Sequence, residues 1–137
     1  MDEAMITIYA REDNLGADEY IDVANKSGIN RPVGDRDRIE RMLAHANLIL
    51  TARQDGRLVG FARSLTDFCF CCYLSDLAVD RACQGQGIGR RLIEETRTAA
   101  GGALTTTLLL SAPGAVTYYE GIKMPKADNC YLYRRER

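Results

Sequence analysis

The feature that most constrains the fold is a glycine-rich turn between an apolar strand and an amphipathic helix. The stretch Tyr73–Glu94 reads YLSDLAVDRACQGQGIGRRLIE. Its three glycines, Gly85, Gly87 and Gly89, occupy alternate positions, where they remove side chains and allow a positive φ without strain. The first N–H groups of the helix that follows have no partner inside the helix, so they point toward one spot. Such a spot attracts phosphate, and the turn is therefore predicted to be an anion-binding loop.

The spacing of the glycines separates this loop from two other phosphate-binding loops. A dinucleotide fingerprint, G-x-G-x-x-G, requires a third glycine at position 90 or 92, where the chain has Arg90 and Leu92. A P-loop requires Gly-Lys-Ser or Gly-Lys-Thr, and the sequence contains neither. The pattern that fits is Gln84-x-x-Gly87-x-Gly89 after a Leu-Ala-Val-Asp strand. The plain alternative is a tight turn that uses glycine for its conformation alone.

This pattern resembles the acyl-CoA-binding motif of the GNAT superfamily of N-acetyltransferases. The resemblance is strongest over residues 72–100 and extends more loosely from the hairpin at Leu48–Thr66 to the segment around Tyr119. It implies acetyl-CoA as the co-substrate, with its pyrophosphate on the loop amides and its pantetheine arm along the central strand. The cofactor-binding residues that it implies are Leu77, Ala78, Val79, Gln84, Gly85, Gln86, Gly87, Ile88, Gly89 and Arg90.

A second family motif, N-x-x-A-x-x-x-Y-x-x-x-G-F, is matched in part. Ala115 and Tyr119 fit, whereas Ala112 stands at the Asn position and Lys123-Met124 at the Gly-Phe pair. In the family this tyrosine gives a proton to the coenzyme A thiolate, so the resemblance implies that Tyr119 is the general acid. The neighbouring Tyr118 is the competing candidate and is expected in the core.

A base for the acceptor amine is sought on the central strand. Asp76 is the acid that precedes the expected cofactor segment, and a carboxylate there can take the amine proton through water. The alternative is a structural role, in which backbone N–H groups at a strand bulge satisfy the carboxylate. The sequence allows both roles.

Composition limits the remaining function classes. The chain has 137 residues, 46% hydrophobic and 27% charged, which predicts one domain over residues 1–137. A formal charge of −1 provides no basic field for nucleic acid, and no apolar run approaches a membrane span. The acidic start Met1-Asp2-Glu3 and the absence of a disulfide pattern among the five cysteines predict a cytoplasmic protein with free thiols. With a single histidine, His45, no metal site is expected.

Periodicity and turn residues predict seven strands and four helices. The first, third and fourth helices are expected at Ala17–Ser27, Ile88–Ala100 and Ala115–Glu120. The second is expected to begin after an Asp35 cap, and its apolar stripe is Ile39, Met42, Leu43 and Ala46. The strands are expected at Met5–Ala10, Leu48–Arg53, Arg57–Leu65, Phe68–Val79, Leu104–Ser111, Lys123–Lys126 and Cys130–Arg134.

These elements give a mixed α+β fold, α/β by some schemes, with a mostly antiparallel sheet of about seven strands. Leu104–Ser111 follows a strand and a helix, so it must lie parallel to Leu74–Val79, and its leucines predict burial on both faces. The GNAT resemblance implies that this central parallel pair splays apart and that the gap takes the pantetheine arm.

The function expected from these observations is acetyl-CoA-dependent N-acetylation of a primary amine on a small molecule. Leu58–Arg63 together with Asp76–Glu94 is similar to small GNAT enzymes that acetylate arylalkylamines such as serotonin, although this similarity lies mostly in the cofactor framework. A polyamine is a further candidate acceptor. The alternatives are a protein or peptide acetyltransferase and a non-catalytic acyl-CoA sensor, and the family resemblance also allows a homodimer.

Overall fold

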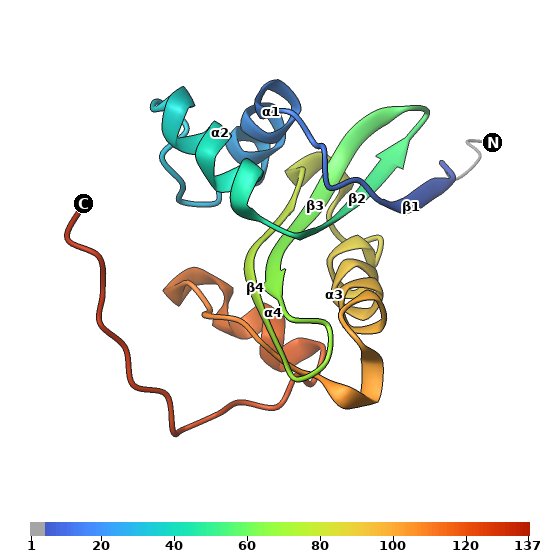
Figure 1. The fold of residues 1–137 in the computed structure, drawn as a ribbon. Coiled ribbons are helices and arrows are strands. Elements are labelled where there is room, and N and C mark those ends of the chain that lie inside the picture. Colours follow the sequence, from blue (N-terminus) through green and yellow to red (C-terminus); the bar gives the residue numbers. More distant parts are fainter. Residues whose placement is uncertain (1–4) are drawn as a thin grey trace.

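A five-stranded sheet with the order β1-β2-β3-β4-β5 forms the centre of the computed structural model, which describes residues 5–137 (Figure 1). Strands β1 to β4 are antiparallel to their neighbours, and β5 runs parallel to β4, as the crossover connection predicts. The strands are β1 (Thr7–Arg11), β2 (Leu48–Gln54), β3 (Arg57–Thr66), β4 (Cys71–Val79) and β5 (Thr106–Leu108). The α-helices are α1 (Ala17–Ser27), α2 (Arg36–His45), α3 (Ile88–Ala99) and α4 (Val116–Gly121), with short 3-10 turns η1 (Arg81–Cys83), η2 (Gly102–Leu104) and η3 (Pro113–Ala115).

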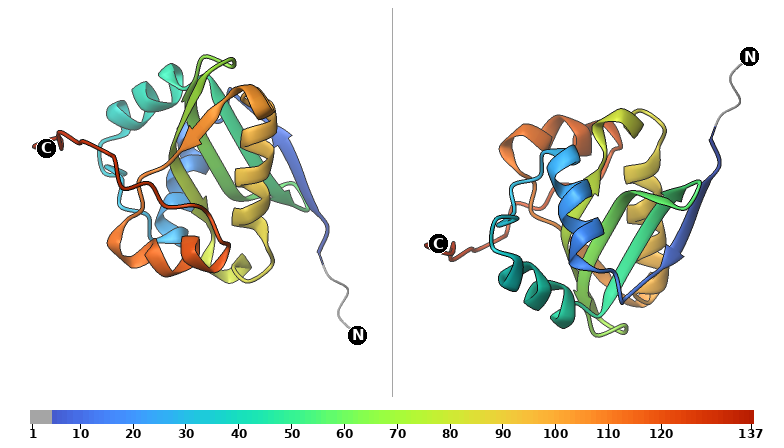
Figure 2. Two further views of the ribbon diagram at one scale, coloured as in Figure 1. Left: turned by 90° about the horizontal axis from the view of Figure 1, so that it is seen from below. Right: turned by 90° about the horizontal axis from the view of Figure 1, so that it is seen from above.

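Helices cover both faces of the sheet (Figure 2). On one face α1 and α2 bury Tyr20 and Ile39 against Phe61 of β3. On the other, α3 buries Ile88 and Leu92 against the second set of strand residues. The mixed α+β class is therefore confirmed, with two apolar layers separated by the sheet.

Two β-bulges, one in β3 and one in β4, determine which side chains face each apolar layer. Arg63 pairs with Asp76 but Ser64 pairs with Leu74, so Ser75 of β4 has no partner on β3. One unpaired residue moves every following side chain to the opposite face. Leu74 therefore packs on the α3 face, whereas Asp76 lies on the α1 face. A similar irregularity in the β2–β3 pairing leaves Val59 without a partner on β2.

Local signals placed most of the helix and turn boundaries correctly. Gly28 ends α1 in the left-handed region at φ 80°, and the Asp35 carboxylate caps α2 by accepting from the Arg38 N–H. Asp55 and Gly56 both have positive φ, as expected for a two-residue hairpin loop.

The end of the chain differs from the prediction, because the sheet has five strands rather than about seven. The eight-residue strand at Leu104–Ser111 is reduced to β5, Leu104 is 71% exposed, and the expected burial on both faces is wrong. The hairpin expected at Lys123–Lys126 and Cys130–Arg134 is likewise wrong, because neither segment forms a strand. A strand needs a hydrogen-bonded partner as well as a suitable composition, and here β4 leaves β5 after three residue pairs.

Candidate active site

The open half of β4 is the first component of the site. Cys71, Cys72 and Tyr73 pair with β5, and among residues 5–137 no strand pairs with the rest of β4 on that side, from Leu74 to Val79. The Asp80 N–H donates to Val59 O on β3 at 2.8 Å. Because backbone groups alternate in direction along a strand, those of Leu77 and Val79 face away from β3. The space beside Leu74–Val79, between β4 and the chain that leaves it after β5, is called the wedge below. An extended ligand can hydrogen-bond to β4 in this wedge.

The glycine-rich loop lies at the wide end of the wedge. Gly85 and Gly87 have φ of 84° and 79°, the region in which only glycine is unstrained. Gly87 is also the N-cap of α3, and no side chain in the described part of the chain caps this helix. A Cβ at Gly85 or Gly87 would meet no atom within 4 Å, so the space beside the loop is open. The free amides and the helix dipole fit a phosphate group at this place.

Other predicted loop residues have contacts of their own. The Gln84 side chain donates to Val79 O at 3.1 Å, which ties the loop to the end of β4. Ile88 is buried in the α3 layer and fixes the first turn of the helix. Arg90 is exposed and forms an ion pair with Glu94 at 3.4 Å, so its guanidinium lies on the helix surface near the loop.

One of the two adjacent tyrosines of α4 lies differently from the prediction. Tyr118 is 42% exposed, so the expectation that it belongs to the core is wrong. Its hydroxyl packs over Gly89, so a larger residue at position 89 would have to displace the Tyr118 ring. Tyr119 is the half-buried member and packs against the α3 layer. The rings make an edge-to-face contact with centroids 5.2 Å apart.

The environment of Tyr119 favours its protonated form. Burial raises the pKa of this phenol, the adjacent Tyr118 raises it further, and the nearby positive charge of Arg31 lowers it in part. The net effect is a pKa above the usual 10. Tyr119 therefore carries its proton at neutral pH, as a general acid must.

Asp76 is fully buried on the α1 face and has three side-chain partners. Its Oδ2 accepts from the Tyr20 hydroxyl and from Arg63 Nε, both at 2.6 Å, and its Oδ1 accepts from Arg31 Nε at 2.7 Å. Burial alone would raise the pKa of Asp76, but the two guanidinium groups outweigh burial and lower it. The partners are side chains rather than the expected backbone N–H groups. These contacts favour the structural alternative, and a role as base stays a prediction.

Arg31 and Arg63 were missed by the sequence analysis. Arg63 interrupts an apolar strand, and a charge there signals a buried partner. Arg31 comes from the connection between α1 and α2, where no periodic pattern marks it. Besides Asp76, Arg31 Nη2 donates to Ser75 O at 2.7 Å and Arg63 Nη2 donates to Ser75 Oγ at 3.1 Å. The two arginines therefore hold the bulge at which β4 changes face.

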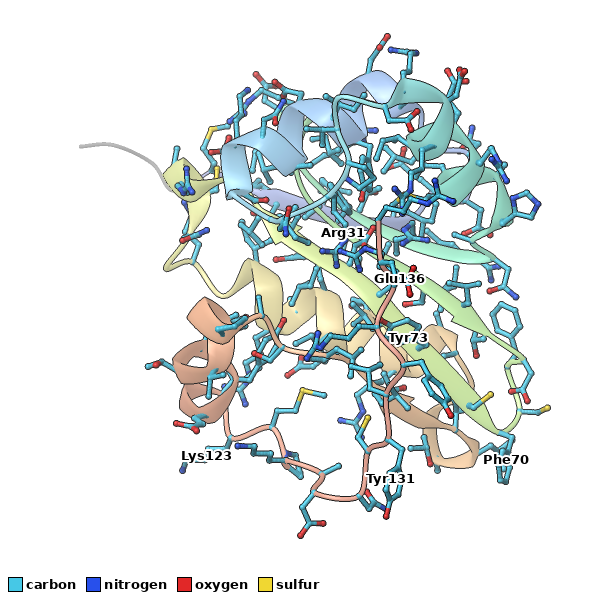
Figure 3. The ribbon with its side chains drawn as sticks, turned by 90° about the vertical axis from the view of Figure 1, so that its left-hand side faces the viewer. Arg31, Phe70, Tyr73, Lys123, Tyr131 and Glu136 are labelled. Carbon is cyan, nitrogen blue, oxygen red and sulfur yellow. The ribbon has the colours of Figure 1, made fainter. Side chains whose placement is uncertain are left out.

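The last residues of the chain lie beside β4, near the point where it separates from β5. Figure 3 shows Glu136 between Arg31 and Tyr73, with the chain descending to Tyr131. The Arg137 carbonyl accepts from Arg38 of α2 at 3.1 Å. Residues 132–137, Tyr73 and Leu110 line a cavity of about 530 Å³. This cavity adjoins the point where β4 and β5 separate, so an acceptor can occupy it.

Comparison with known proteins assigns this arrangement to a family. Residues 21–122 match the family model of the acetyltransferase (GNAT) domain. The chain belongs to the GNAT family. Within residues 5–137 of this GNAT chain, no group of three histidine, cysteine or carboxylate side chains is placed to hold a metal, and no helix is long and apolar enough to cross a membrane.

Individual relatives agree with the family assignment. The GNAT chain is 29% identical over 93 residues to serotonin N-acetyltransferase 2, chloroplastic, from Oryza sativa subsp. japonica; the match covers 64% of the chain and 46% of the rice protein. This chain thus spans about half the length of that relative.

Among solved structures, a GNAT-family acetyltransferase from Streptococcus pneumoniae has a TM-score of 0.73 at 19% identity, covering 96% of this chain and 100% of the other. An aminoglycoside N-acetyltransferase in complex with CoA has a TM-score of 0.71 at 13% identity, covering 100% and 99%. At these identities the likeness shows the fold.

Proposed function

We propose that this GNAT chain is an acetyl-CoA-dependent N-acetyltransferase that acts on the primary amine of a small molecule. The observation that carries the proposal is the wedge between β4 and β5, which opens toward the uncapped N-terminus of α3. The wedge suits an extended arm with amide groups, and the helix terminus suits a pyrophosphate. Acetyl-CoA has both parts in one molecule.

The residues divide the binding of acetyl-CoA between them. The amides from Gly85 to Arg90 bind the pyrophosphate, and the outward-facing backbone groups of Leu77 and Val79 bind the pantetheine arm. Ala78 lies between them and is paired with Phe61 of β3, so it supports the arm only by holding the strand in place. Gln84 holds the loop against Val79. The thioester then lies toward the narrow end of the wedge, on the side of Tyr119.

The reaction transfers one acetyl group and one proton. The neutral amine attacks the thioester carbonyl, an N–C bond forms, and the C–S bond breaks. Tyr119 gives a proton to the departing thiolate and recovers one from the amine through solvent. Asp76 is kept as the candidate base only through water, because its two oxygens already accept hydrogen bonds from three side chains.

The acceptor is proposed to be an arylalkylamine, with a polyamine as the second choice. The rice relative is named as a serotonin N-acetyltransferase, which supports an aromatic amine. The cavity beside the wedge has the apolar and aromatic side chains of Tyr73, Leu110, Leu132 and Tyr133, and it also contains the carboxylate of Glu136. The apolar and aromatic side chains can pack against an aromatic ring. Arg134, Arg135 and Arg137 line the same cavity, so Glu136 gives it no net attraction for an ammonium group, which favours an aromatic amine over a polyamine.

Two other functions remain to be compared with this one. A protein or peptide acetyltransferase uses the same wedge but acts on a lysine or an N-terminus, and a sensor binds acetyl-CoA without turnover. The retained and protonated Tyr119 favours an enzyme over a sensor. A cytoplasmic location and a homodimer are proposed with this function, as the composition and the family resemblance lead us to expect.

The deciding experiment is a thiol-release assay with acetyl-CoA and a panel of acceptors. The panel contains serotonin and tyramine, spermidine, an aminoglycoside, free amino acids and a lysine-containing peptide. We expect turnover that is fastest with the arylalkylamines. Fastest turnover of the peptide would favour the second function. Binding of acetyl-CoA with no acetylated product from any acceptor would favour the sensor.

A further inference from the structure

The buried side chain of Gln54, the last residue of β2, contacts the phosphate-binding loop at two places. Gln54 is 4% exposed and lies at the end of β2, on the buried side of the loop. Its Nε2 donates to Gln86 Oε1 at 2.9 Å, and its Oε1 accepts from the Cys83 thiol at 3.7 Å. Cys83 precedes the glycines and Gln86 lies between two of them. One amide therefore holds both the start and the middle of the loop.

A third contact fixes the amide itself. Gln54 Nε2 also donates to Thr7 Oγ1 of β1 at 3.1 Å. Both N–H groups and the oxygen of the amide are thus used, and three partners together set its orientation. Gln86 is exposed, so its hydrogen bond to Gln54 is the contact that orders its side chain. The sheet therefore holds the middle of the loop through Gln54, in addition to the Gln84–Val79 hydrogen bond at its start.

The loop needs such support because its backbone has unusual freedom. Gly85 and Gly87 flank Gln86, and glycine loses more conformational entropy on ordering than any other residue. A loop that is already ordered before it binds an anion does not lose this entropy on binding. We propose that Gln54 is the positioning residue that keeps the loop in its anion-binding conformation in the free protein. The identity of the anion rests on the proposed function, whereas the ordering of the loop does not.

The first test measures the loop without any ligand. Gln54→Met keeps the side-chain length and removes all three contacts, and Gln86→Ala removes the exposed partner without a cavity in the core. Thr7→Val is the matched control, because it removes the one contact outside the loop. We expect amide hydrogen exchange at residues 85–89 to accelerate in the first two variants and to stay unchanged in the control. Unchanged exchange in both Gln54→Met and Gln86→Ala would overturn the proposal.

The second test measures the consequence for binding by titration with coenzyme A. We expect its Kd to rise about three- to tenfold in Gln54→Met and in Gln86→Ala, the effect of one or two hydrogen bonds. The double variant should be no weaker than Gln54→Met, because both changes break the same contact. Kd values in the single variants equal to that of the parent would count against the proposal.

The third test uses S-acetylpantetheine, which lacks the pyrophosphate. Its kcat/KM should be equal in parent and variants if Gln54 acts through the phosphate loop, and an equal loss with both thioesters would show a general structural defect instead. Faster loop exchange in the two variants, together with a parent protein that does not bind coenzyme A, would support the ordering by Gln54 and refute the proposed function, so the two can fail separately.

Discussion

At the scale of single residues, Asp76 is a buried charge on the α1 face, and its neighbours there must supply hydrogen bonds and positive charge to stabilise it. A buried carboxylate loses its hydration, and two guanidinium groups compensate for this with one short hydrogen bond each, at 2.7 and 2.6 Å. Removing one member of such a set leaves the others buried without a partner. The ion pairs therefore make Asp76 important for stability whether or not it takes part in catalysis.

Asp76→Asn is expected to lower the free energy of unfolding at pH 7 by about 3–5 kcal/mol, the cost of breaking a buried ion pair. Asp18→Asn is the control, because its pair with Arg36 is exposed and contributes less than about 1 kcal/mol. Urea denaturation measures both. A loss in Asp76→Asn as small as that in the control would contradict the structural role.

The same substitution predicts a pH dependence. The folded pKa of Asp76 lies below its ordinary value of 3.8, so its charge contributes stability that is complete above the unfolded pKa and is lost as pH falls through the folded pKa. The difference in unfolding free energy between parent and Asp76→Asn should therefore be constant from pH 7 to 5 and shrink below about pH 4. Urea titrations along this series measure it; a difference that stayed constant to pH 2 would refute the assignment.

Tyr119→Phe tests the general acid. The ring and its packing remain but the proton is lost, so kcat is expected to fall by roughly 10²–10⁴-fold while the Kd of acetyl-CoA changes little. Because the pKa of Tyr119 is raised, the parent should keep its activity up to about pH 10. Steady-state kinetics with a saturating amine measure kcat and its pH dependence, and titration with acetyl-CoA measures the Kd. Tyr118→Phe is the control, and an equal kcat in parent and Tyr119→Phe would remove the acid from the mechanism.

At the scale of elements, the start of α3 depends on one backbone conformation. Gly87→Ala places a Cβ on a residue with φ of 79°, which costs about 1–2 kcal/mol, and it should also weaken coenzyme A binding because the loop amides shift. Gly34→Ala has equal space and no positive φ, so it should be neutral or slightly stabilising. Denaturation and titration of both variants give the comparison. Equal stability in the two would show that the loop tolerates another conformation.

The sequence predicted the elements whose signals are local. The Asp35 cap, the Gly28 end and the Asp55-Gly56 turn each act on neighbouring residues, and each lies where the sequence placed it. The final hairpin and the length of β5 were predicted wrongly, because strands depend on partners that the local pattern does not contain. Gln54 and Arg31 were not found for the same reason, since their contacts lie 32 and 45 residues away along the chain.

At the scale of the whole molecule, ligand binding should raise thermal stability. A ligand that binds only the folded state at a hundredfold excess over its Kd adds about 2.7 kcal/mol. For a domain of this size that corresponds to a rise in Tm of roughly 5–10 °C with acetyl-CoA. Thermal shift measurements with NAD provide the control, and no shift is expected. A shift with NAD and none with acetyl-CoA would refute the cofactor assignment.

The short pairing between β4 and β5 also determines the order in which the chain folds. β2, β3 and β4 follow one another through short turns, so their pairing closes small loops, whereas β5 must return across α3 to form only three residue pairs. We expect the transition state for folding to contain the β2–β4 meander and to lack β5. A destabilising change in β5, such as Thr107→Ala, should then speed unfolding and leave the folding rate unaltered. The edge that leaves room for the ligand is thereby also the last part of the sheet to assemble.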